Sequence, residues 1–198
     1  IGSGMLFSAL LAPLIGKAAT QVGSLIMWAT ELQPFFMGIL VSALVGIALT
    51  LPISSAAICA ALGLTVLAGG AAVAGCCAQM VGFAVISFQE NGVSGLVSQG
   101  LGTSMLQMGN IVKNPRIWIP ATFASMITGP LATCIFHFEN NGPAVTSGMG
   151  TCGLVGPIGV YTGWLKAVEE GGKSAVTAMD WVYLLLLCFI LPAILSLL

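Results

Sequence analysis

The sequence predicts an all-α fold, a polytopic bundle of transmembrane helices with re-entrant hairpins. Of its 198 residues, 58% are hydrophobic and only 6% are charged, whereas about a quarter of the residues in a soluble domain are charged. The mean hydropathy is +1.06. Residues 32–89 contain no charged side chain and no histidine, a stretch that is long enough for two or three crossings of about 20 residues each. A soluble monomer is therefore excluded.

The helices of the first half are predicted from the breaks in this apolar stretch. Proline and paired glycines interrupt helices, and three such breaks occur, at Pro34, Leu51-Pro52 and Gly69-Gly70. These breaks place helices at residues 35–51, 55–67 and 71–88, after a partial span that precedes Trp28.

Three further helical segments are predicted in the second half. Residues 93–108 repeat apolar side chains at three- and four-residue intervals, which indicates an amphipathic helix that packs against the bundle. Residues 116–138 form an apolar span that is interrupted by Pro120 and Pro130. Residues 178–198 form the last span, and Trp181 and Tyr183 at its start are typical of anchors at a membrane surface.

Residues 143–163 carry no charge but are too rich in glycine for an ordinary helix that faces lipid. Pro157 interrupts the segment, as do six glycines: Gly148, Gly150, Gly153, Gly156, Gly159 and Gly163. Non-helical backbone is tolerated at membrane depth where protein or a water-filled cavity surrounds it, so this segment is predicted to form a re-entrant hairpin. Its Gly-x-Gly-x-x-Gly spacing does not indicate a dinucleotide site, because no strand precedes it.

Two polar segments are candidates for a ligand site, because polar side chains at membrane depth usually line a cavity or contact a partner. The first follows Pro52 and contains Ser54 and Ser55. The second lies at the start of the Gly-rich segment and contains His137, Glu139, Asn140, Asn141, Thr146 and Ser147. Carboxylate, amide and imidazole groups together accept and donate hydrogen bonds, which suits a neutral, hydroxylated ligand.

Each polar segment also has a purely structural interpretation. Ser54 and Ser55 fit local capping of the helix break at Pro52, because hydroxyls beside a break can bond to free backbone groups. Glu139 and its neighbours fit a solvated loop outside the membrane, where a carboxylate carries no desolvation penalty.

No catalytic constellation, metal site or cofactor site is predicted. The chain has one histidine and no nucleophile elbow, which argues against a Ser-His-acid triad and against zinc. The six cysteines lie in apolar stretches without a Cys-x-x-Cys pair and are interpreted as small buried side chains. A net charge of −1 without a basic run argues against a nucleic-acid partner.

Four motifs resemble the membrane-spanning IIC component of bacterial sugar phosphotransferase systems. They are LQPFFMGILV at residues 32–41, LPISS at 51–55, KNPRIWIP at 113–120 and the Gly-rich run at 148–163. The chain is most similar to the branch described as perfringolysin-regulator-type. The resemblance extends over essentially the whole chain.

The resemblance implies a homodimeric alternating-access carrier in the bacterial inner membrane, which binds a sugar between two re-entrant hairpins. It implies that separate IIA and IIB components perform any phosphoryl transfer. It also implies that residues 1–198 form a single membrane-embedded domain, the C-terminal part of a longer polypeptide whose N-terminal portion is missing here.

The motifs depart from the family pattern at both sugar-binding positions. Sugar-transporting relatives typically have a Leu-Pro break followed by His and, in the second hairpin, a Glu-Pro pair. Here Ser54 and Ser55 follow the break, while Gly142 precedes Pro143 and the acid is displaced to Glu139. Three functions stay open: a sugar carrier that uses Glu139 and His137, a transport-inactive membrane sensor or regulator that retains the fold, and a purely structural subunit that dimerises through its small-residue faces.

Overall fold

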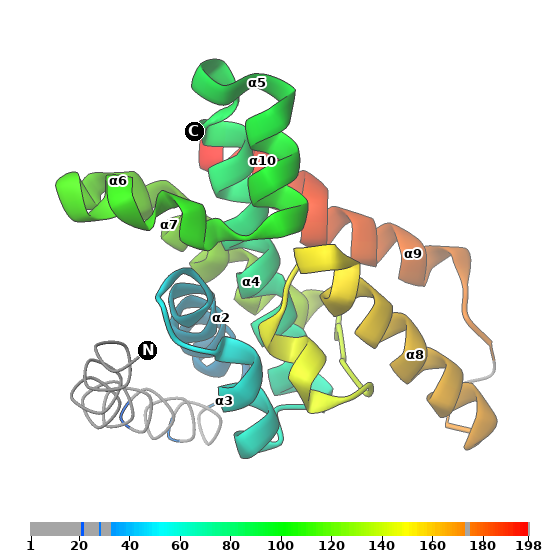
Figure 1. Ribbon diagram of the computed structural model, residues 1–198. Helices are drawn as coiled ribbons and strands as arrows, with labels where there is room; N and C mark the ends of the chain where they lie inside the picture. The colour runs from blue at the N-terminus through cyan, green and yellow to red at the C-terminus, as the bar shows by residue number, and fades with distance from the viewer. Residues whose placement is uncertain (1–20, 22–27, 29–32, 173–174, 198) are drawn as a thin grey trace, which may run out of the picture.

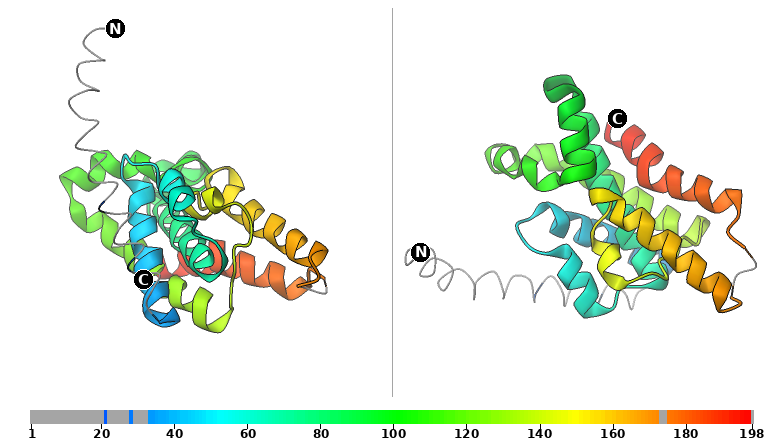
Figure 2. Two further views of the ribbon diagram at one scale, coloured as in Figure 1. Left: turned by 90° about the horizontal axis from the view of Figure 1, so that it is seen from below. Right: turned by 45° about the vertical axis from the view of Figure 1, so that its right-hand side comes forward.

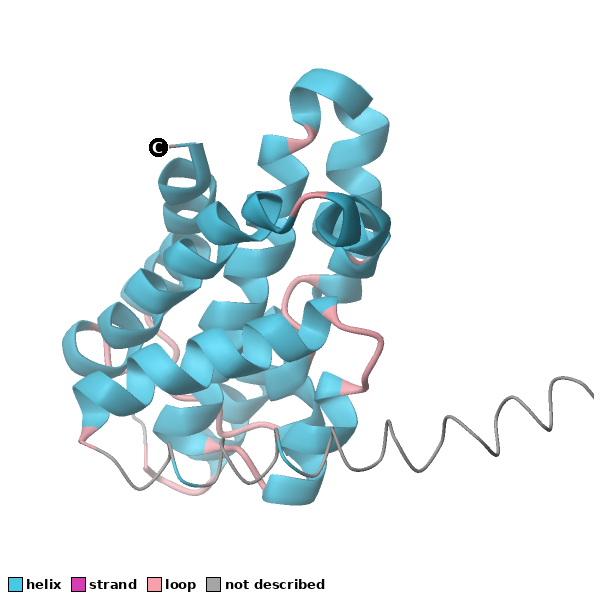
Figure 3. Cartoon of the chain, turned by 90° about the vertical axis from the view of Figure 1, so that its left-hand side faces the viewer, coloured by secondary structure: helices cyan, strands magenta, loops and turns pink. Residues whose placement is uncertain are grey.

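The computed structural model describes residues 21, 28, 33–172 and 175–197, and this part of the protein is built from helices (Figure 1). Within these residues no β-strand forms, and one isolated antiparallel bridge joins Val66 to Asn140 (Figure 3). The predicted all-α fold is confirmed. The partial span predicted before Trp28 lies, apart from Gln21, outside the described residues.

Three helices that contact one another form the centre of the bundle. They are α2 (Pro34–Thr50), α4 (Val66–Ile86) and α7 (Trp118–Pro130). Small residues allow them to approach closely: a Cβ atom on Gly75 would collide with the backbone of Ser42, and one on Gly129 with the carbonyl of Gly38. Packing of this kind is how helices associate where lipid removes the hydrophobic driving force.

Among the described residues, three helical stretches are long and apolar enough to cross a membrane: Val66–Ile86, Pro115–Ile135 and Ala178–Leu197. The second joins η3 (Pro115–Ile117), α7 and η4 (Leu131–Ile135), and the third joins α9 (Ala178–Leu185), η7 (Leu186–Ile190) and α10 (Leu191–Leu197). A π-helical turn directly follows Pro130, and another ends two residues before Pro192, because proline lacks an amide hydrogen and disturbs the regular helical hydrogen bonds. The spans predicted at residues 116–138 and 178–198 are confirmed as helices, except that the first ends at Ile135, three residues earlier than predicted, and residue 198 lies outside the described residues.

The predicted break at Gly69-Gly70 is wrong. Helix α4 begins at Val66 and contains both glycines, while α3 (Ser55–Leu62) ends earlier than predicted, at Gly63 with φ +62°. Gly70 serves close packing instead, because a Cβ atom there would collide with the carbonyl of Phe138. A glycine pair in an apolar run thus marks either a break or a contact, and the sequence pattern does not distinguish the two.

The single amphipathic helix predicted at residues 93–108 is also wrong. The chain forms α5 (Phe88–Val97), η1 (Ser98–Gly102), η2 (Ser104–Gln107) and α6 (Met108–Lys113). Thr103 is extended, with φ −159°, and its hydroxyl accepts a hydrogen bond from the Met105 amide at 3.2 Å. Two nearby glycines weaken the helix, and a threonine that caps a new turn divides it.

The Gly-rich segment is irregular only in its first part. Two short 3-10 turns, η5 (Ala144–Gly148) and η6 (Cys152–Leu154), precede α8 (Val155–Glu169). Pro157 does not break α8, because it lies in the first turn, where an amide hydrogen has no helical partner. Turn η5 packs against α3, and α8 continues toward α9 at one side of the bundle (Figures 1 and 2). The depth of this segment in a membrane stays a prediction.

Candidate functional site

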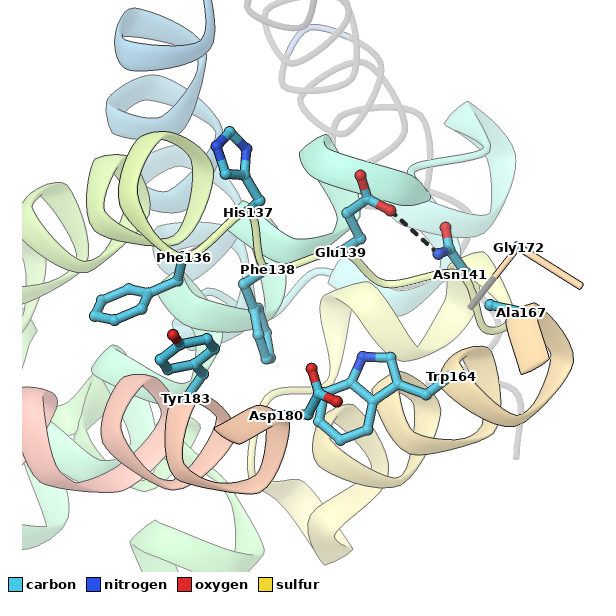
Figure 4. Close-up of a pocket in the computed structure, with 10 residues that line it drawn as sticks. All are labelled: Phe136, His137, Phe138, Glu139, Asn141, Trp164, Ala167, Gly172, Asp180 and Tyr183. Carbon is cyan, nitrogen blue, oxygen red and sulfur yellow. Dashed lines mark hydrogen bonds between the residues drawn. The ribbon is translucent and has the colours of Figure 1, made fainter. Parts of the chain in front are cut away.

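The candidate site is centred on residues 136–141, which follow η4. The chain turns at Phe136 and His137, and we call the whole stretch the extended segment because it pairs with α4 at Asn140. The main chain of this segment pairs with the start of α4: the Val66 amide donates to the Asn140 carbonyl at 2.8 Å and the Asn140 amide donates to the Val66 carbonyl at 2.9 Å. Figure 4 shows His137, Glu139 and Asn141 on one side of the segment and Phe136 and Phe138 on the other.

A cavity of about 360 Å³ surrounds this segment, between it and the helices α8 and α9. We call it the α8–α9 cavity. Its volume lies at the lower end of the range of ligand pockets, about 300–1,000 Å³. Residues from the segment, from α8, from Gly172 and from α9 line it: Phe136, His137, Phe138, Glu139, Asn141, Trp164, Ala167, Gly172, Asp180 and Tyr183.

Aromatic rings form much of the cavity wall. The rings of Phe136 and Tyr183 lie 4.8 Å apart between centroids, and Trp164 is only 6% exposed. Trp181 holds the two helices together, because its ring lies 5.2 Å from Tyr161 and 5.9 Å from Trp164. Phe136 and Tyr183 are half-buried, so their rings can present a flat apolar face to a sugar ring.

Two carboxylates line the same cavity. Glu139 is half-buried and accepts a hydrogen bond from the Asn141 amide group at 3.3 Å. Asp180 accepts hydrogen bonds from the backbone amide and the hydroxyl of Thr177, both at 2.8 Å, and so forms the capping box at the start of α9. Helix capping therefore holds an acidic group at the cavity edge.

His137 has an unusual backbone conformation for a residue with a side chain. Its φ angle is +44°, in the left-handed region, and its side chain is exposed. Such conformations are uncommon outside glycine and are concentrated at functional sites. The turn at His137 directs the chain from η4 into the extended segment.

Three of the predicted site residues hold the segment in place and do not line the cavity. Asn140 is fully buried, and its side-chain amide donates to the hydroxyls of Thr146 at 3.0 Å and Ser147 at 2.8 Å. The side-chain oxygen of Asn140 accepts a hydrogen bond from the Gly142 backbone amide at 3.1 Å. Ser147 in turn donates to the Leu64 carbonyl at 2.7 Å. The arrangement ties the extended segment to η5 and to the α3–α4 connection.

The other two predicted residues, Ser54 and Ser55, also bond within the protein. Ser54 is the N-cap of α3 and accepts from the Ala57 amide at 3.2 Å, and buried Ser55 donates to the Gly148 carbonyl at 2.7 Å. The first polar segment therefore meets the end of η5 through the bond from Ser55 to Gly148. Only His137, Glu139 and Asn141 of the eight predicted residues line the α8–α9 cavity.

Sequence reasoning missed the half of the cavity that α8 and α9 supply. Trp164 and Asp180 were not singled out, and Tyr183 was interpreted only as a membrane anchor. The available signal was the capping pattern Thr177-x-x-Asp180 directly before an aromatic-rich apolar run. Among the described residues, no three His, Cys, Asp or Glu side chains gather as a metal would require.

A second polar cluster lies inside the central helices, and we call it the Gln79 cluster. It consists of Gln79 on α4 with Thr50, Ser104, Trp118, Thr122 and Ser125. The Gln79 amide donates to the hydroxyl of Thr122 at 3.1 Å, and its oxygen accepts from the Trp118 indole at 3.2 Å. Gln79 is fully buried and is not in contact with the α8–α9 cavity.

Comparison with known proteins identifies the family. A family model described as "Phosphotransferase system, EIIC" matches residues 1–198. The chain belongs to this family. Membership makes it a membrane component of a phosphotransferase-system sugar transporter, with a sugar substrate and IIA and IIB partners in general terms. Searches of curated proteins and of solved structures gave no match.

Proposed function

We propose that this EIIC protein binds a sugar in the α8–α9 cavity and carries it across the bacterial inner membrane by alternating access. The multi-pass domain would deliver the sugar to a separate phosphorylated IIB component, which is supplied in turn by IIA. Family membership and three apolar helices of spanning length support the general role. A homodimer is the assembly that we expect.

One observation carries the choice of site: the extended segment presents His137, Glu139 and Asn141 in one row beside an aromatic wall. Glu139 would accept hydrogen bonds from sugar hydroxyls, while His137 and Asn141 would orient the ring. The buried Asn140, Thr146 and Ser147 would keep the segment in place as the surrounding helices move. Ser54 and Ser55 support the site through α3 instead of contacting the sugar.

A second candidate function is that of a transport-inactive sensor or regulator that retains the EIIC fold. The observation that favours it is the position of Ser54 and Ser55, whose hydroxyls bond within the protein and do not line the cavity. The first hairpin therefore offers the ligand no strong polar group from these positions. A sensor has to bind its ligand but does not have to carry it across the membrane.

Ligand-induced stabilisation tests the site directly. The purified full-length wild-type protein and its Glu139→Gln variant are each heated in detergent, with and without a panel of sugars and sugar phosphates. A ligand at 100 times its dissociation constant stabilises the folded state by about 2.7 kcal/mol. We expect one sugar to raise the melting temperature of the wild type but not of Glu139→Gln.

Glu170→Gln is the matched control, because this exposed carboxylate on the same side of the bundle does not line the cavity. Equal stabilisation of all three proteins would contradict the site. Uptake of the identified sugar into cells that express the protein with its IIA and IIB partners then separates the two functions. Binding without uptake would favour the sensor.

A further inference from the structure

Tyr183 is a residue of the cavity wall whose polar group makes no hydrogen bond within the protein. It lies on α9, is half-buried and lines the α8–α9 cavity with Phe136 (Figure 4). Within the part of the chain that the structure describes, its hydroxyl has no hydrogen-bond partner. Asp180, in contrast, accepts two hydrogen bonds at the start of its own helix, and Glu139 accepts one within the extended segment. The phenol hydroxyl is therefore left for a ligand.

The protein holds the ring of Tyr183 in position. Its centroid lies 4.8 Å from that of Phe136, with an angle of 51° between the ring planes. Aromatic pairs at this separation attract each other. Helix α9 is itself fixed by its capping box and by Trp181, whose ring contacts Tyr161 and Trp164 of α8. A ligand that bonds to the Tyr183 hydroxyl therefore does not have to order a flexible side chain.

A phenol hydroxyl differs from the carboxylates that line the same cavity. It donates one hydrogen bond and also accepts, whereas the Glu139 carboxylate only accepts. One hydroxyl of a sugar can therefore accept from Tyr183 while another donates to Glu139. A site built to bond a hydroxyl discriminates against a ligand that lacks it, because the polar group of the site is then left without a partner.

We propose that the Tyr183 hydroxyl donates a hydrogen bond to one ring hydroxyl of the bound sugar and that Tyr183 determines specificity. The cavity then selects sugars that carry a hydroxyl at this ring position over sugars that lack it. This inference rests on the proposed function, since it names a contact in the same cavity. It gives Tyr183 a role beyond that of the membrane anchor predicted from the sequence.

Two variants isolate the hydroxyl. Tyr183→Phe removes the hydroxyl alone and keeps the ring packed against Phe136. Tyr161→Phe is the matched control, because Tyr161 is the other tyrosine of the chain and is also half-buried, but does not line the cavity. Its ring packs against Trp181. Both variants retain these aromatic contacts and should keep the melting temperature of the wild type.

Isothermal titration with deoxy sugars tests the contact. Purified full-length protein in detergent is titrated with glucose, galactose, mannose and N-acetylglucosamine, and then with the monodeoxy analogues of the sugar that binds. We expect Tyr183→Phe to weaken binding of the parent sugar about fivefold, the size of one hydrogen bond between neutral groups. One analogue should bind the wild type about fivefold more weakly than the parent sugar does, and should bind Tyr183→Phe and the wild type equally. Tyr161→Phe should bind each sugar as the wild type does.

The outcomes separate this inference from the proposed function. A Tyr183→Phe protein that binds the parent sugar as tightly as the wild type overturns the inference but leaves the sugar site standing. Weaker binding in which every analogue loses the same factor in both proteins also overturns it, because Tyr183 then contacts no particular hydroxyl. If none of the sugars binds to the folded wild-type protein, both the inference and the proposed sugar site fail.

Discussion

The Gln79 cluster and the α8–α9 cavity place polar groups in the same apolar protein, but their hydrogen bonds differ. In the cluster, the Gln79 side-chain nitrogen donates to Thr122 and its oxygen accepts from Trp118, both on α7. Thr50 bonds to Ser104. At the cavity, two carboxylates line an open space of about 360 Å³. The polar groups of the cluster bond to one another, whereas the carboxylates at the cavity can accept hydrogen bonds from a ligand.

The difference shows that a polar residue in an apolar helix is not by itself a sign of a ligand site. Polar groups at membrane depth need partners, and other helices can supply them as well as a substrate can. Gln79 stabilises the contact of α4 with α7, while Glu139 lines a cavity. The same helix α4 serves both regions, because its Gly70 contacts the extended segment.

The largest effect should come from separating the segment from α4. In Gly70→Val, the new side chain collides with the Phe138 carbonyl, which is backbone and cannot rotate away. We expect a loss of stability of about 3 kcal/mol or more, with little folded protein recovered. Gly109→Ala is the control, because no atom lies near its added Cβ. Size-exclusion profiles in detergent and thermal unfolding measure the difference.

The next effect should come from the Gln79 cluster. Gln79→Leu has a similar volume but leaves the Trp118 indole and the Thr122 hydroxyl without their amide partner. We expect a loss of about 2 kcal/mol in stability, the penalty of two half-buried groups that lose a partner. Sugar affinity of the remaining folded protein should stay unchanged. An altered sugar preference would show that the cluster belongs to the binding site.

Asn140 should affect both stability and binding. The hydroxyls of Thr146 and Ser147 donate to the carbonyls of Pro143 and Leu64, so Asn140 must donate to both hydroxyls. Aspartate has no donor at this position, and Asn140→Asp should therefore be as harmful as Asn140→Ala, at about 2 kcal/mol. Thermal unfolding of the two variants measures this. A stable Asn140→Asp protein would contradict the assigned hydrogen-bond directions.

The sequence could predict the fold class because composition alone excludes a soluble protein and proline positions bound the spans. It could also single out His137, Glu139 and Asn141 as candidates for the site, since these are polar side chains beside a glycine-rich segment, and all three line the cavity. It could not predict that Asn140 lies on the opposite face, because one extended residue reverses the direction of a side chain.

The same limit applies to contacts between distant segments. Gly69 and Gly70 were interpreted as a helix break because no local pattern reveals that Asn140 lies against the first and Phe138 against the second. Trp164 and Asp180 reach the cavity through the pairing of α8 with α9, which depends on tertiary contacts of Trp181. Residues that act through packing between elements are therefore the ones that sequence patterns miss.

The smallest effect on stability should come from Glu139→Gln, and it gives the sharpest test of the comparison. Glu139 is half-buried, and among the described residues its side chain accepts a hydrogen bond only from Asn141, a residue two positions away in the sequence. We expect stability to change by no more than about 0.5 kcal/mol. Glutamine nevertheless replaces an acceptor-only oxygen by a donor, so ligand-induced stabilisation should be lost.

Gln79→Leu and Glu139→Gln should thus give opposite results in the same two measurements. The first should lower the melting temperature without changing the stabilisation by sugar, and the second should do the reverse. A Glu139→Gln protein that unfolds several degrees lower would show that the carboxylate holds the segment in place, as Asn140 does. In that case the α8–α9 cavity would be a second closed polar cluster, and the ligand would have to bind elsewhere in the EIIC domain.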